Sequence, residues 1–288
     1  MTTTAGAAAV APAATERFVH PHRSVRSATA AAFGALLLRD LTVLRRNLKE
    51  FIPRTIMQPL LLVFVFTYVF PKIGQSVGGG QRASEFSTLL IAGVVGLSII
   101  FQGIQSVAIP MVQEFGYTKE IEDRVLAPMA VSMVAIEKIV AGGIQSLISA
   151  AIVFPVAYFV PATPVHLHVN WIVLITLTPL ACITAAALGL TFGTRFEPRT
   201  VPILFGIIVV PLTFLGAIYY PWARLTPIAW LKVLVLVNPL VYISEGYRAA
   251  LVGEISHMPL VAIYGALVGF AVFLTWTGIR GFKIRVLA

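Results

Sequence analysis

The sequence is poor in charge and has a single cysteine. Asp, Glu, Lys and Arg make up 11% of its 288 residues, whereas an ordinary soluble domain contains about 25%. So little charge cannot cover a globular surface in water, which argues against a soluble enzyme. Because Cys182 is the only cysteine, an intrachain disulfide and a cysteine-based zinc site are excluded.

The sequence also lacks the short motifs of several catalytic sites. It contains no G-x-x-x-x-G-K-[ST] phosphate loop and no H-E-x-x-H or C-x-x-C pattern. The apolar runs hold no Asp or Glu apart from Glu137 near one end, although a proton-driven carrier or an intramembrane hydrolase usually needs an ionisable residue within the membrane. We therefore expect no catalytic residue, and no metal site at the isolated pair His166 and His168.

What the sequence does contain is apolar mass. Hydrophobic residues account for 58% of the chain and the mean hydropathy is +0.90, which excludes overall disorder and indicates an integral membrane protein. A helix needs about 20 apolar residues to cross a bilayer. This criterion predicts an all-α fold with six transmembrane helices, near residues 54–71, 86–112, 139–161, 170–194, 200–221 and 256–279. The first is long enough only if Arg54 extends to the headgroups.

A seventh apolar stretch, Leu225–Ser244, is interrupted. Lys232 lies near its middle, and Pro227 and Pro239 leave helical pieces too short to cross. We expect residues 225–253 to form a re-entrant or interfacial helical hairpin on the outer face, packed against the rest of the protein.

The distribution of basic residues orients the six spans. With the N-terminus inside, 16 of the 21 Lys and Arg residues lie on the inner side, as the positive-inside rule requires. We therefore expect a multi-pass protein of the bacterial plasma (inner) membrane with both termini cytoplasmic. The net charge of +9 reflects this orientation, and we expect the lipid bilayer as a partner and no nucleic acid.

Two segments precede the first span. Residues 1–32 are rich in Ala and Thr and are expected to form a disordered cytoplasmic tail. Residues 33–53 combine apolar residues at helical spacing with Arg39, Arg45, Arg46 and Lys49, which predicts an amphipathic helix in the membrane interface, ended by Pro53. A cytosolic helix packed on its own protein is the alternative. The membrane domain then covers residues 54–288.

The second span carries a stripe of uncharged polar residues. Ser98, Gln102, Gln105 and Ser106 fall within one arc of the helix, while Gly93, Gly96 and Gly103 lie on another face. Such a stripe is typical of a helix that lines a translocation path on one side and packs closely on the other. The alternative is that the polar side chains only hydrogen-bond neighbouring helices.

The loop after this span, Glu114–Met129, is acidic on an otherwise basic side. A short helix within it would present Lys119, Glu122 and Asp123 together. This mixed-charge helix is either a contact for a cytosolic partner or a solvated connector.

Three segments, taken in order, resemble the permease subunits of ABC-2 type exporters. They are the basic entry helix with Arg39-Asp40-Leu41 and Arg45-Arg46, the loop Tyr-Thr-Lys-Glu…Arg-Val-Leu-Ala-Pro-Met at residues 117–129, and Asn238-Pro-Leu-Val-Tyr-Ile-Ser-Glu-Gly-Tyr-Arg248 before the last span. The resemblance covers residue 33 to the C-terminus, so residues 54–288 are expected to form an ABC-2 type transmembrane domain.

The resemblance implies a division of labour. ATP and Mg would be bound by separate cytosolic ABC ATPase subunits, this chain would have no cofactor of its own, and two permease chains, identical or different, would form the membrane channel. Coupling to the ATPase is expected from Glu114, Tyr117, Lys119, Glu120, Glu122, Asp123 and Arg124. Asn238, Pro239 and Arg248 would help close the outer end.

The expected function is export of a hydrophobic or amphiphilic compound, such as a drug, a lipid, or a glycolipid or polysaccharide. An ATP-independent channel or carrier is the main alternative. A membrane-embedded lipid-modifying enzyme is a second, but it would need a catalytic constellation, and the nearest acidic cluster, Glu120, Glu122 and Asp123, has the wrong spacing for one.

Overall fold

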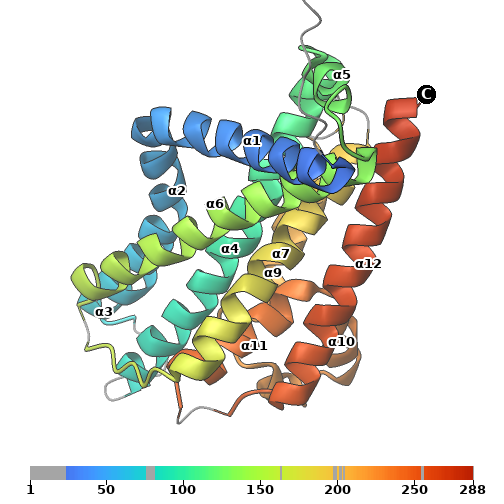
Figure 1. Ribbon diagram of the computed structural model, residues 1–288. Helices are drawn as coiled ribbons and strands as arrows, with labels where there is room; N and C mark the ends of the chain where they lie inside the picture. The colour runs from blue at the N-terminus through green and yellow to red at the C-terminus, as the bar shows by residue number, and fades with distance from the viewer. Residues whose placement is uncertain are drawn as a thin grey trace, which may run out of the picture.

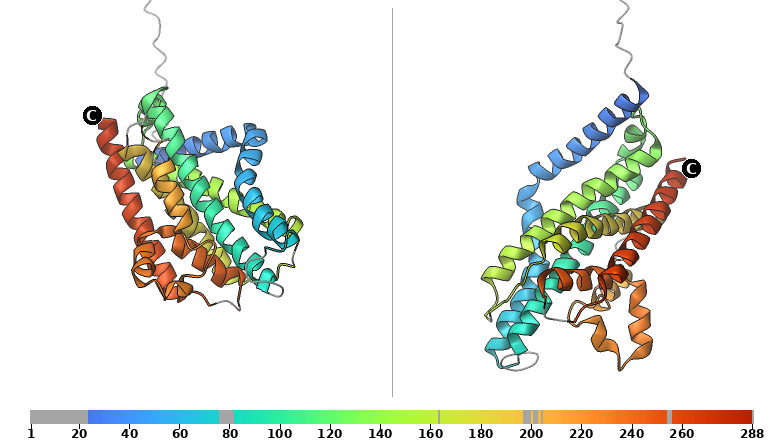
Figure 2. Two further views of the ribbon diagram at one scale, coloured as in Figure 1. Left: turned by 180° about the vertical axis from the view of Figure 1, so that it is seen from behind. Right: turned by 60° about the horizontal axis from the view of Figure 1, so that its bottom comes forward.

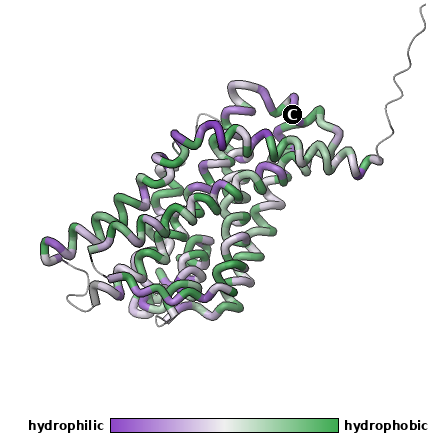
Figure 3. Tube along the Cα trace, turned by 60° about the vertical axis from the view of Figure 1, so that its left-hand side comes forward, coloured by the Kyte–Doolittle hydropathy of each residue, from purple (hydrophilic) through white to green (hydrophobic). Residues whose placement is uncertain are grey.

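The computed structural model describes residues 24–75, 82–162, 164–196, 200, 203, 205–253 and 256–287, and within them it contains helices and no strand. The long helices are α1 (Val25–Arg46), α2 (Leu48–Val63), α4 (Arg82–Gly116), α6 (Val131–Phe159), α7 (Trp171–Arg195) and α12 (Leu260–Leu287). Figure 1 shows the last four inclined alongside one another, with α1 lying across their ends. Figure 3 shows the long helices coloured mostly as hydrophobic, with hydrophilic positions near the C-terminus and at other ends of the helices.

Shorter elements complete the chain. A π-helical turn, η1 (Phe64–Val69), and α3 (Phe70–Lys72) continue α2, and α5 (Glu120–Val125) lies between α4 and α6. After α7 come η2 (Phe205–Val209), α9 (Val210–Phe214), η3 (Trp222–Leu225), α10 (Ala229–Leu234), η4 (Val235–Val237) and α11 (Pro239–Leu251). Figure 2 shows α1 and α5 at one end of the bundle and α10 at the other. The end that carries α1, α5 and the C-terminal end of α12 is called the basic end below.

Six helices are long and apolar enough to cross a membrane among the residues described, which confirms the expected fold class. They are Val25–Arg46, Leu48–Lys72, Ser84–Gly116, Val131–Phe159, Trp171–Arg195 and Leu260–Leu287. The set differs from the expected one at two places. It includes α1, and near the expected span 200–221 the structure describes helix only at Ile203 and from Phe205 to Phe214. Residues 197–199, 201–202 and 204 lie outside the described residues, so a crossing there stays a prediction.

The entry helix begins and ends earlier than its composition predicts. Most of the expected tail, residues 1–23, lies outside the described part of the chain, but the helix already begins at Val25. It breaks at Asn47 rather than at Pro53, which lies inside α2. The reason for the break is tertiary: α2 must turn so that Thr55, Pro59 and Val63 face the bundle, and packing in a membrane protein tolerates the hydrogen bond that a proline removes. None of the α1 residues is buried, and its position in the membrane interface stays a prediction.

Helix α4 forms the centre of the bundle, and its glycines allow close contact. A Cβ added at Gly103 would lie 2.5 Å from the Ala185 Cβ on α7, and one added at Gly189 on α7 would lie 2.7 Å from the Gly103 carbonyl oxygen. Small residues let membrane helices approach in this way. The glycine face of α4 therefore packs closely, as the sequence predicts.

The expected hairpin is present as a bent helix pair. The segments Ala229–Val237 and Pro239–Leu251 meet at 97°, and every residue of α11 is buried whereas none of α10 is. Burial of α11 against α4, α7 and α12 provides the protein packing that a broken helix needs in a membrane protein.

Candidate functional site

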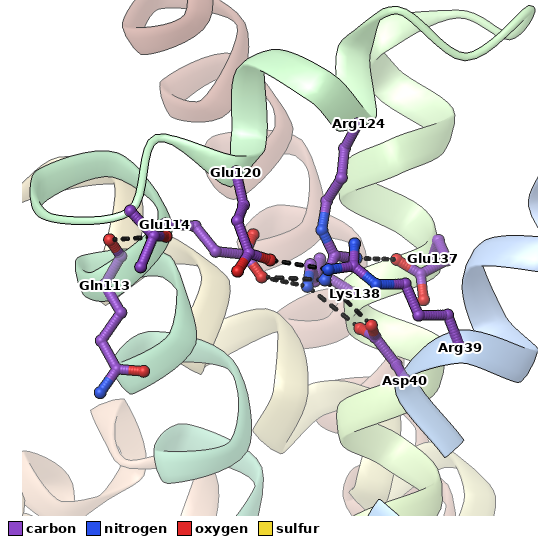
Figure 4. A network of polar contacts seen from close by, with 9 residues as sticks. Arg39, Asp40, Gln113, Glu114, Glu120, Arg124, Glu137 and Lys138 are labelled. Carbon is purple, nitrogen blue, oxygen red and sulfur yellow. Dashed lines mark hydrogen bonds and ion pairs between the residues drawn. The ribbon is translucent and has the colours of Figure 1, made fainter. Parts of the chain in front are cut away.

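An ionic network joins four helices at the basic end (Figure 4). The Arg124 guanidinium on α5 lies 3.0 Å from Asp40 on α1 and 3.1 Å from Glu114 on α4. The Lys138 ammonium on α6 lies 3.0 Å from Asp40 and 2.7 Å from Glu114. Arg124, Lys138 and Glu114 are buried, so the network holds α5 firmly against the bundle.

Carboxyl groups outnumber cations in this network. Glu137 is fully buried, its carboxylate makes no hydrogen bond, and its nearest cation is Arg124 at 3.9 Å. Two cations therefore serve three carboxylates. Burial by itself lowers the pKa of Arg124, but the carboxylates of Glu114 and Asp40 outweigh it and hold that pKa above its ordinary value. Arg124 thus remains charged, and removal of either cation would leave buried carboxylates without a counter-charge.

The predicted coupling residues divide into two groups. Glu114 and Arg124 belong to the network, and Glu120 forms an exposed ion pair with Arg39 at 2.8 Å. Tyr117, Lys119 and Asp123 are exposed, and the side chain of Glu122 lies outside the described residues.

Sequence reasoning assigned no role to Asp40, Lys138 or Glu137. In the sequence, Asp40 is a lone acid within the basic entry helix, and Glu137 and Lys138 are a charged pair just before an apolar run. Neither indicates a partner, because the partners are far apart in the sequence.

A cleft of about 630 Å³ opens beside the network. Its walls come from the end of α1 and the start of α2 on one side and from α4 on the other, with α5 and α6 closing it. Gln102, Gln105 and Ser106 line this cleft. The fourth residue of the predicted stripe, Ser98, does not: it is buried and donates to the Val94 carbonyl oxygen at 2.9 Å.

The glutamines of the stripe also bridge helices. Gln102 Oε1 accepts a hydrogen bond from Thr55 Oγ1 at 3.2 Å, and Gln105 Oε1 accepts one from the Arg54 guanidinium. Arg54 therefore contacts the cleft instead of only extending to the headgroups. The cleft and the interhelical bonds agree with both interpretations of the stripe, as a path and as a helix contact.

At the opposite end, the three predicted hairpin residues have structural roles. Asn238 caps α11, since its Oδ1 accepts from the Leu240 N–H at 2.9 Å and its Nδ2 donates to the Leu212 carbonyl oxygen at 2.7 Å. Pro239 is the first residue of α11, where its missing N–H costs nothing.

Arg248 is fully buried and pairs with Glu245 at 2.6 Å. Its guanidinium also donates to the carbonyl oxygens of Ala217 and Ile218. Glu245 in turn accepts from the Trp222 N–H at 2.8 Å and the Met258 N–H at 2.9 Å. The pair therefore joins α11 to residues 217–222, which follow α9, and to Met258, just before α12. Glu245 was not singled out from the sequence, because only the fold shows what its carboxylate contacts.

In the described ranges, no group of three or more His, Cys, Asp and Glu side chains is arranged to hold a metal ion.

Comparison with known proteins identifies a family. The sequence model of the family described as ABC-2 type transporter matches residues 31–252. These residues run from α1 to the end of α11, and thus take in the ionic network, the cleft and the hairpin. A search of curated proteins finds no match.

Proposed function

Because the chain belongs to the ABC-2 type transporter family, we propose that it is the membrane subunit of a bacterial ATP-driven exporter for a hydrophobic or amphiphilic compound. It is a multi-pass membrane permease of a non-catalytic family, whose members generally pair with ABC ATPase subunits that hydrolyse ATP. The basic end would face the cytoplasm, as the positive-inside rule requires. A second permease, identical or different, would complete the channel.

The observation that carries this proposal is the attachment of α5 to the helices around it. Arg124 links the short helix to Asp40 on α1 and Glu114 on α4, and Figure 1 shows α5 projecting beyond the bundle. A force applied to α5 would therefore be transmitted to both walls of the cleft. Two large apolar side chains beside α5 are exposed, Tyr117 at 72% and Leu126 at 82%. They form the surface on which an ATPase subunit would dock.

We expect the double variant Tyr117→Ser, Leu126→Ser to lose most ATPase binding. Truncation of an aromatic anchor such as Tyr117 at the centre of an interface costs about 2 kcal/mol or more, so co-purification with the ATPase should fall at least roughly tenfold. Tyr158→Ser, Phe159→Ser is the matched control, because these side chains are similarly exposed (81% and 80%) at the opposite end of α6. Undiminished capture by the first variant would exclude α5 as the docking element.

Transport by the purified chain without any ATPase would favour a channel or carrier.

We further propose that the cleft is the cytoplasmic part of the translocation path. In a Cys182→Ala background, Gln102→Cys and Gln105→Cys should react with a membrane-impermeant thiol reagent, because both positions line the cleft. Ser98→Cys is the control on the same helix, since it is nearly isosteric and buried, and it should stay unlabelled. Gly103 is unsuitable, because a side chain there collides with Ala185. Equal protection of all three cysteines, with and without trapped nucleotide, would leave the stripe as a helix contact only.

A further inference from the structure

Most charges around the cleft neutralise one another. Arg39 pairs with Glu120, and the two cations Arg124 and Lys138 are held by Asp40 and Glu114. Arg54 is different. Although it lines the cleft, it forms no ion pair with any residue that the structure describes, and its guanidinium donates to the neutral Gln105. Glu50, one turn earlier on α2, lines the same cleft but lies outside ion-pairing distance of it.

The neighbours of Arg54 present hydrogen-bond donors. The amide oxygens of Gln102 and Gln105 are both occupied, by Thr55 and by Arg54 itself. Each oxygen keeps a second lone pair, and each amide NH₂ group can donate two hydrogen bonds to a ligand. A guanidinium beside two amide donors is a set that recognises an anion such as a phosphate or carboxylate.

Part of the cleft wall is apolar. Val43 and Leu44 at the end of α1, Phe51 on α2, and Ile109 and Pro110 on α4 all line it. The exposed α1 crosses the ends of the bundle helices (Figure 1), as a helix lying among headgroups would. The lining carries four acidic and four basic side chains, so the attraction for an anionic lipid headgroup rests on Arg54, the basic side chain of the four that forms no ion pair among the described residues.

We propose that this cleft binds the anionic headgroup of a membrane amphiphile, with Arg54 as the anchoring charge and the side chains of Val43, Leu44 and Phe51 against its chains. The inference deepens the proposed function, because it rests on the same glutamines and on a cytoplasmic basic end. It assigns the cleft a ligand class, a singly or doubly anionic lipid, that the transporter family membership does not specify.

The test is lipid binding by the purified full-length chain in a non-ionic detergent, with bound lipids counted by native mass spectrometry. Phosphatidylglycerol and phosphatidylcholine of identical acyl chains serve as probes. We expect preferential binding of phosphatidylglycerol, reduced roughly tenfold or more by Arg54→Gln because a charge-assisted hydrogen bond is lost, with phosphatidylcholine binding unchanged. Arg54→Lys should retain most of the preference, because it keeps the charge.

Two control variants test whether Arg54 itself is the anchor. Arg46→Gln removes an exposed basic residue of α1 outside the cleft and should leave the preference intact, whereas an equal loss would indicate non-specific surface attraction and overturn the proposal. Glu50→Gln should maintain or increase binding; if it abolished binding, Arg54 would not be the anchor. Free glycerol 1-phosphate should fail to compete at lipid concentrations, and effective competition would mean that the ligand is a free phosphate and not a lipid.

The outcome is separable from that of the proposed function. Lipid binding is measured without an ATPase, and ATPase capture is measured through Tyr117 and Leu126. Loss of phosphatidylglycerol preference with intact capture would reject only the lipid site, whereas failed capture with intact lipid preference would reject only the coupling role.

Discussion

Replacing Arg248 with methionine should lower the free energy of unfolding by roughly 3–5 kcal/mol, because it leaves the fully buried Glu245 carboxylate without its cation. The carbonyl oxygens of Ala217 and Ile218 would lose their donor in the same step. Thermal unfolding in detergent, followed by size-exclusion chromatography, measures the effect.

The double variant Arg248→Met, Glu245→Gln should recover part of the lost stability. A glutamine is neutral, so the unpaired charge disappears, and its amide oxygen still accepts one of the hydrogen bonds that Glu245 accepts from Trp222 and Met258. Arg224→Met, at an exposed arginine before the same hairpin, is the control and should change stability little. An Arg248→Met protein as stable as the parent would show that the pair does not hold the hairpin.

Lys138→Met should have the second large effect, at the basic end. It removes one of the two cations that serve Asp40, Glu114 and Glu137, and breaking a buried ion pair from one side typically costs about 3–5 kcal/mol. We expect lower thermal stability and faster amide hydrogen exchange in α5, because its attachment through Arg124 depends on the same carboxylates. ATP hydrolysis by the partner should then proceed with little transport.

Three variants separate charge from shape in this network. Lys138→Arg keeps the cation and should behave nearly as the parent. Lys138→Met combined with Glu114→Gln removes one charge of each sign and should regain part of the stability. Arg39→Met breaks an ion pair whose side chains are 48% and 43% exposed, and should cost at most about 1 kcal/mol. If Arg39→Met were as damaging as Lys138→Met, burial would not be what gives the network its strength.

Several features were predictable because they depend on neighbouring residues alone. Apolar runs long enough to cross a bilayer are local features, and the helical membrane fold agrees with expectation. The prolines and Lys232 that interrupt Leu225–Ser244 are local as well, and the bent helix pair at Ala229–Leu251 agrees with expectation too. The glycine face of α4 is also a local pattern, and its contact with α7 follows from the absence of side chains.

Boundaries were less predictable. The entry helix breaks at Asn47 because α2 has to pack on the bundle. Among the neighbouring residues, Pro53 is the strongest signal for a helix end, so the local sequence places that end too late. Near residues 200–221, hydropathy predicts a span and the structure describes helix from Phe205 to Phe214, so this crossing stays a prediction.

By itself, then, the sequence determined that this protein is a helical membrane permease without a phosphate loop, since hydropathy and motifs are properties of short segments. The tertiary structure alone decided how its charges are used. Asp40 is distant in the chain from Lys138, and Arg248 is distant from Ala217. The isolated sequence therefore cannot show that these buried cations contact a carboxylate or a carbonyl oxygen. Desolvation makes each such charge costly unless a partner meets it in space, so folding determines both the network that holds α5 and the placement of Arg54 at the cleft.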